Sequence, residues 1–127
     1  MLGRSLAAQG ATQGLQLTLV LSSSEPCRLP ARPRVQILLA GRPATVRQVP
    51  LRLSSEDVPR RVIGPGRSAV AMLRWSNWCG RRARVSLRLS LGGVSIVDTL
   101  GPWPSIAPVC VAPKLPSTLA VSLFVRR

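Results

Sequence analysis

The sequence contains no histidine and no tyrosine, and only four of its 127 residues are acidic. Catalytic triads and Cys-His pairs use an imidazole as the general base, so the lack of histidine excludes both. A glycosidase needs two carboxylates held a fixed distance apart, and among the acids only Glu56 and Asp57 are close in sequence. Zinc would depend on cysteine sulfur and scattered carboxylates. We therefore predict no catalytic residue, no metal site and no cofactor, in a protein that is not an enzyme.

Basic residues, by contrast, are abundant. The formal net charge is +14, and Lys114 is the only lysine among the 18 basic residues. This charge is typical of proteins that bind nucleic acid, anionic lipid or another polyanion, although arginine in place of lysine is also what GC-rich codons produce. Neither of the two densest runs has the interleaved aromatic residues of a single-strand binder, so nucleic acid is not favoured and we expect most arginines to be solvated. The candidate polyanion contacts in these runs are Arg60, Arg61, Arg81, Arg82 and Arg84.

Long apolar runs are missing as well. No stretch of about 18 uncharged apolar residues is present, so the sequence codes for no transmembrane helix. Residues 1–14 are small and polar and lack the apolar run of a signal peptide. We expect them to form a flexible N-terminal segment.

Short segments of alternating polarity begin after this segment. Apolar side chains recur there at every second position, which is the pattern of half-buried strands. In residues 85–91 the valine and leucines alternate with Ser86, Arg88 and Ser90, which we expect to face outward. The following Gly92-Gly93 pair fits a two-residue hairpin turn.

Proline and glycine punctuate these segments. Pro50 indicates an edge strand because proline cannot donate to a ladder, and Gly64-Pro65-Gly66 indicates a tight turn. A closing strand is expected over residues 119–126, with Leu123 on its apolar face. The whole pattern predicts a single all-β sandwich domain of about seven strands over residues 15–127.

The three cysteines are Cys27, Cys79 and Cys110. Their spacing is unlike that of a CxxC metal knuckle. A structural disulfide, buried free thiols, and a reactive or metal-binding role all remain open, and spacing alone does not separate the three pairings.

The three tryptophans form a second group. Trp75, Trp78 and Trp103 would provide an aromatic platform for a carbohydrate or planar ligand, or would pack in the core and at corners of the sandwich. Trp103 lies between two prolines and is the candidate exposed aromatic residue.

Several motifs in this order resemble the domain of unknown function 4232 family, found in secreted proteins and lipoproteins of actinobacteria. The resemblance covers roughly residues 14–127. The matching motifs are Pro26-Cys27-Arg28-Leu29, Ile63-Gly64-Pro65-Gly66-Arg67-Ser68-Ala69, Trp75-Ser76-Asn77-Trp78-Cys79, and Cys110 with Ser117-Thr118-Leu119.

The resemblance implies an immunoglobulin-like β-sandwich outside the cytoplasm, with no established activity. It favours a disulfide between Cys79 and Cys110. Members usually carry an earlier cysteine and follow a signal peptide or membrane anchor. We therefore expect either that Met1 lies inside a longer protein or that the start of the sequence is misplaced, with Cys27 the partner of the earlier cysteine.

We therefore expect a non-enzymatic, secreted or envelope-associated interaction or structural module. Its expected partner is a protein or an envelope polymer, and its oligomeric state is open. The alternative is an arginine-rich surface that binds polyanions such as nucleic acid, anionic lipid or an envelope polymer.

Overall fold

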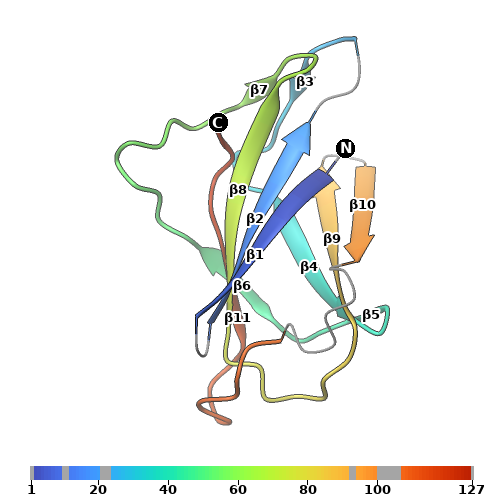
Figure 1. Ribbon diagram of the computed structural model, residues 1–127, viewed down its shortest axis with the longest axis vertical. Coiled ribbons are helices and arrows are strands. Elements are labelled where there is room, and N and C mark those ends of the chain that lie inside the picture. The colour runs from blue at the N-terminus through green and yellow to red at the C-terminus, as the bar shows by residue number, and fades with distance from the viewer. Residues whose placement is uncertain (1, 10–11, 21–23, 92–93, 100–106, 127) are drawn as a thin grey trace.

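The computed structural model describes residues 2–9, 12–20, 24–91, 94–99 and 107–126. Within these ranges the protein is all-β and contains no helix, as the sequence predicts (Figure 1). Four of its strands have only two residues, so the strands outnumber the seven or so expected. The strands are β1 (Leu2–Gln9), β2 (Thr12–Val20), β3 (Cys27–Arg28), β4 (Arg34–Leu39), β5 (Arg42–Pro43), β6 (Arg47–Pro50), β7 (Val62–Ile63), β8 (Ser68–Ser76), β9 (Val85–Leu91), β10 (Val94–Thr99), β11 (Thr118–Val121) and β12 (Val125–Arg126).

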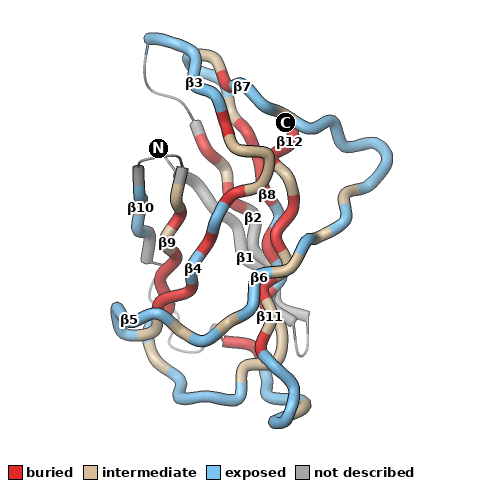
Figure 2. The backbone as a smooth tube through the Cα atoms, turned by 180° about the vertical axis from the view of Figure 1, so that it is seen from behind, coloured by how far each residue is buried: buried red, intermediate tan, exposed pale blue. Residues whose placement is uncertain are grey.

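The described strands form two main sheets and one small one. The larger sheet has the order β1-β2-β8-β11-β6, and β12 also pairs with β8. The second sheet has four strands in the order β10-β9-β4-β5, and β3 pairs with β7 in a separate ribbon. This ribbon lies at one end of the molecule, and the connections β8–β9 and β5–β6 lie toward the other (Figures 1 and 2). All these pairs are antiparallel except β11 with β6.

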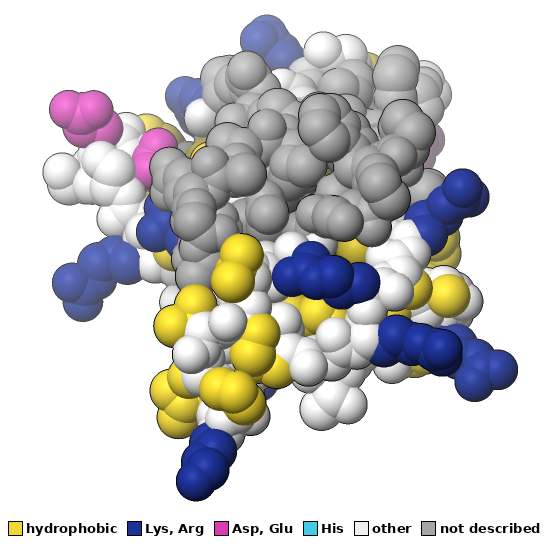
Figure 3. Space-filling view, turned by 60° about the horizontal axis from the view of Figure 1, so that its bottom comes forward, with side chains coloured by type: hydrophobic (Ala, Val, Ile, Leu, Met, Phe, Trp, Pro, Cys, Tyr) yellow, Lys and Arg dark blue, Asp and Glu magenta, His cyan; other side chains and the backbone are white. Residues whose placement is uncertain are grey.

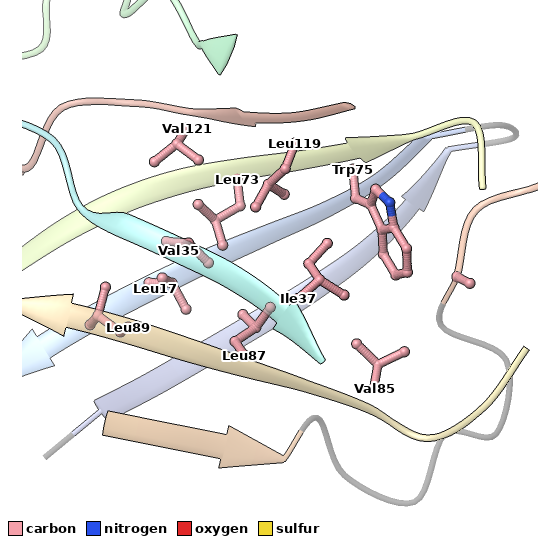
Figure 4. Close-up of a cluster of buried hydrophobic side chains, with 11 residues drawn as sticks. Leu17, Val35, Ile37, Leu73, Trp75, Val85, Leu87, Leu89, Leu119 and Val121 are labelled. Atoms are coloured by element: carbon pink, nitrogen blue, oxygen red, sulfur yellow. The ribbon is translucent and has the colours of Figure 1, made fainter. Parts of the chain in front are cut away.

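The two main sheets share one hydrophobic core. Alternate side chains of each strand point to one face of its sheet, and Figure 4 shows these side chains from both sheets pointing into the same space. Trp75 closes one end of the cluster, and Ala107 also belongs to it. The strand residues of the cluster are Leu17, Leu73, Trp75, Leu119 and Val121 from the larger sheet and Val35, Ile37, Val85, Leu87 and Leu89 from the smaller.

A second cluster fills the end near the β3–β7 ribbon. It contains Leu29, Ile63 and Phe124, together with residues of β2 and β8. Phe124 is 1% exposed. The expected closing strand placed Leu123, not Phe124, on its buried face. In the structure Leu123 is only half-buried.

The closing strand is interrupted at Ser122, which explains this difference. The backbone N–H of Met72 in β8 donates to Ser122 Oγ at 2.8 Å. The serine hydroxyl therefore accepts a hydrogen bond that a backbone carbonyl would accept in a regular strand pair. The backbone of Phe124 then pairs with loops rather than with β8, donating to Ala31 and accepting from Arg60. Alternation alone does not reveal such a break, because the apolar pattern continues through it.

Other local predictions are confirmed. Pro50 ends β6, the edge strand of the larger sheet. The turn at Gly64-Pro65-Gly66 has Gly66 at φ +71° and a hydrogen bond from Arg67 N to Gly64 O. Leu91 of β9 pairs with Val94 of β10, as the predicted hairpin requires, and the two glycines between them lie outside the described residues.

Two expectations were wrong. Residues 2–9 form β1, paired along its whole length with β2, rather than a flexible segment. This pairing covers one edge of β2, a contact that the weak apolar pattern of these residues does not signal. Ser86 is buried rather than facing solvent, and Leu38, its partner in register on β4, is buried as well.

Candidate functional site

The five candidate polyanion contacts do not form one surface. Arg60 and Arg61 directly precede β7, at the end that carries the β3–β7 ribbon. Arg81, Arg82 and Arg84 lie in the β8–β9 connection, residues 77–84, at the opposite end (Figure 1). The two densest arginine runs are therefore separated by the length of the sheets.

Two of these arginines are engaged with backbone. Arg82 Nη1 donates to the carbonyl of Ala107 at 2.7 Å, and Arg82 Nη2 donates to that of Pro108 at 2.9 Å. Arg60 Nη1 donates to Val62 O at 3.4 Å. Arg82 thus braces the start of the segment that leads to Cys110.

The disulfide joins Cys79 to Cys110, which is the pairing that the family resemblance implies. The two Cα atoms are 4.6 Å apart, within the range that a disulfide spans. The bond ties the β8–β9 connection to residues 107–117, which we call the disulfide loop. Three prolines in this loop, Pro108, Pro113 and Pro116, limit its ability to dock through a regular ladder.

Asn77 also connects the end of β8 to the disulfide loop. Its Nδ2 donates to Ala112 O at 2.9 Å and to Leu115 O at 3.1 Å. Its Oδ1 accepts from the backbone N–H groups of Val111 and Ala112, each at 2.9 Å. Asn77 adopts φ +59°, a left-handed conformation that asparagine tolerates better than most residues. One side chain therefore organises three residues of the loop.

The tryptophans divide as core and corner residues. Trp75 Nε1 donates to Ser117 Oγ at 2.8 Å, and that hydroxyl donates to Ser76 O at 3.0 Å. Trp78 is half-buried, and its ring centroid lies 5.8 Å from that of Trp75. Trp103 lies outside the described residues. Trp75 is buried, so the two described tryptophans do not together form an open platform.

The outer part of the disulfide loop is apolar and exposed. Val109, Val111 and Leu115 are 55%, 65% and 64% exposed. Figure 2 colours most of this loop as exposed, and Figure 3, which brings this end of the molecule forward, shows hydrophobic side chains gathered on part of its surface. Because exposed apolar patches mark interaction surfaces, the outer part of the disulfide loop is a candidate binding surface.

Cys27 is a free, exposed cysteine on β3, remote from the disulfide. Within the described ranges, no helix is long and apolar enough to cross a membrane, and no group of three or more potential metal ligands is found.

No family model, curated protein or solved structure matches the chain.

The sequence did not identify Asn77 as a site residue. The available signal was that this residue is the only asparagine in the chain and stands two positions before Cys79. The exposed trio Val109, Val111 and Leu115 was also missed, because apolar residues in a proline-rich segment fit a buried loop equally well.

Proposed function

We propose that this chain is a non-enzymatic, extracytoplasmic binding domain that recognises a protein partner through its disulfide loop. The observation that carries the proposal is an exposed apolar side chain on a backbone that is held in place. Val111 is 65% exposed, while its own backbone is held by Asn77 and its neighbour Cys110 is tied to Cys79. A surface ordered before binding loses less conformational entropy when a partner docks.

The strand order supports an immunoglobulin-like sandwich. In such folds one sheet has the order A-B-E-D and the other G-F-C, with C′ added in some members. The strands β1, β2 and β8 follow the order A-B-E, and β10, β9, β4 and β5 follow the order G-F-C-C′, while β6, the counterpart of D, is not adjacent to β8. The additional strand β11 lies between β8 and β6. Domains of this type commonly bind through the loops at one end of the sandwich.

The disulfide supports a location outside the cytoplasm. Cys79 and Cys110 are both exposed, so cytoplasmic reductants would reach the bond, and structural disulfides persist mainly in oxidising compartments. The same pairing is the one expected from the resemblance to the domain of unknown function 4232 family. Secretion or attachment to the cell envelope follows as part of the proposal.

The charge of the chain indicates the chemistry of the partner. A second copy would also carry a formal charge of +14, so repulsion opposes self-association through this end of the molecule. Lys114 lies within the disulfide loop, and Arg84 lies in the connection beside it. An acidic protein with an apolar patch at the centre of its binding face is the complementary partner.

Photo-crosslinking in the organism that makes the protein tests the proposal. A photoreactive amino acid replaces Val111 or, as a matched control, Val58, which is 51% exposed in a different loop. We expect one discrete heterologous adduct from position 111, none from position 58, and loss of the adduct when Leu115→Asp is added. No adduct from position 111, the same adduct from position 58, or a product with the mass of two copies would refute the proposal.

Polyanion binding is the less favoured alternative, because the two arginine runs lie at opposite ends and Arg82 braces backbone carbonyls. A salt titration separates the two functions. Binding of an oligonucleotide driven by counterion release would collapse between about 50 and 200 mM salt. Partner binding centred on apolar side chains would persist over that range.

A further inference from the structure

A cleft of about 670 Å³ lies at the same end of the molecule as the disulfide loop. One wall is made by Trp78, Arg81 and Ala83 of the β8–β9 connection, and the other by the β4–β5 hairpin and the two residues that follow it. The residues of this second wall are Leu39, Ala40, Arg42, Pro43, Ala44 and Thr45.

The two walls are fixed relative to each other. Ala40 and Gly41 have φ values of +50° and +79°, as in the tight two-residue turns that join antiparallel strands. A left-handed conformation is uncommon for alanine. The backbone N–H of Ala40 donates to Arg84 O at 2.9 Å, which links the hairpin to the connection that carries Trp78. The cleft is therefore formed before any ligand binds.

The Trp78 indole is also held in place. Its Nε1 donates to Arg81 O at 3.0 Å, and its ring packs at an interplanar angle of 53° on Trp75. A Cβ added to Gly80 would lie only 2.6 Å from Trp78 Cζ2, so the backbone approaches the ring closely. Trp78 is half-buried and is one of the residues that line the cleft.

The cleft combines this aromatic surface with two positive charges. Arg42 and Arg81 are both exposed and both line it, and none of the residues named as its lining is acidic. Leu39, Pro43 and Ala44 add apolar contact. Guanidinium groups bind carboxylate, sulfonate and phosphate through charge-assisted hydrogen bonds, and an indole face accepts a planar apolar group.

We propose that this cleft binds a small aromatic anion, which is a planar apolar ring that carries one carboxylate, sulfonate or phosphate. The site is separable from the surface proposed for the protein partner. Within the β8–β9 connection, Asn77, Cys79 and Arg82 contact the disulfide loop. Trp78 and Arg81 instead line the cleft.

The test uses the full chain and 2-naphthoate as the probe, followed by the indole N–H resonances of the protein in NMR spectra. Trp78→Phe assigns the Trp78 signal by its disappearance. We expect 2-naphthoate to shift this signal with a Kd of about 1 mM, the affinity that a ligand of this size reaches in an open site. Arg42→Gln and Arg81→Gln should each weaken binding about five- to tenfold.

Three controls make the result decisive. The neutral analogue 2-naphthamide should bind at least about fivefold more weakly, because it lacks the charge that pairs with the arginines. Acetate should bind more weakly still, because it lacks the ring. Arg61→Gln, an exposed arginine at the other end of the molecule, should leave binding unchanged. Equal binding of the amide, equal weakening by Arg61→Gln, or an unmoved Trp78 signal would each overturn the proposal.

Discussion

Replacement of Asn77 tests whether a single side chain holds the disulfide loop. Asn77→Gly removes the side chain but keeps the left-handed backbone accessible, since glycine adopts positive φ at no steric cost. Asn77→Ala removes the same hydrogen bonds and also places a Cβ in the left-handed region, at the φ of +59° that this residue has. Comparison of the two variants separates the hydrogen bonds from the backbone conformation.

The expected magnitude follows from the four hydrogen bonds. Two of them are exposed and two are partly buried, so we assign about 0.5 kcal/mol to each exposed bond and about 1–1.5 kcal/mol to each of the others. Asn77→Gly should therefore lower the free energy of unfolding by about 3–4 kcal/mol. Asn77→Ala should lower it by about 1 kcal/mol more.

Urea unfolding followed by tryptophan fluorescence measures these changes, since Trp75 is buried and bonded to Ser117 next to the loop. Ser55→Ala, at an exposed position in another loop, is the control and should change the free energy of unfolding by less than about 0.5 kcal/mol. If Asn77→Gly also changes it by less than about 0.5 kcal/mol, the loop does not depend on this side chain. If alanine is tolerated better than glycine, the argument from the left-handed backbone is wrong.

Three further substitutions probe the fold around the site. The double variant Cys79→Ser/Cys110→Ser opens a loop with a sequence separation of 31 and should lower the unfolding free energy by up to about 4 kcal/mol, measured by urea unfolding against the oxidised protein. Gly80→Ala should displace the Trp78 ring, because the new Cβ would lie 2.6 Å from Trp78 Cζ2. The NMR resonance of the Trp78 indole N–H should then move, and an unchanged resonance would contradict the close approach. Phe124→Ala should cost about 3–5 kcal/mol in unfolding free energy, because this side chain is 1% exposed, and a loss under about 1 kcal/mol would show that it does not fill the second cluster.

Alternation in the sequence was sufficient to predict the central strands. The apolar face of β9 follows directly from Val85, Leu87 and Leu89 at every second position, because a strand places them on one side of the sheet. The pattern failed where a distant segment decides the outcome. The strand β1 is stabilised by pairing with β2, and the break at Ser122 depends on its hydroxyl accepting from Met72, 50 residues away in sequence.

The site was less predictable for the same reason. The Cys79–Cys110 pairing came from the family resemblance, since three cysteines allow three pairings. The hydrogen bonds of Asn77 join residues 34 to 38 positions apart, a relation that no local pattern encodes. The exposure of Val111 became visible only with the loop in place, because sequence does not distinguish an apolar residue that is buried from one that is presented to a partner.

The most direct test of the proposed function compares how tightly two matched variants of this chain bind its partner. The partner is the protein identified by cross-linking from position 111. Val111→Asp places a charge at the centre of the proposed surface, and Val58→Asp places the same charge at a similarly exposed position in a different loop. Titration calorimetry with the purified partner should show binding weakened at least about 30-fold by Val111→Asp, as for a residue at the centre of an interface, and essentially unchanged by Val58→Asp. Equal affinities of the two variants would contradict recognition through the disulfide loop.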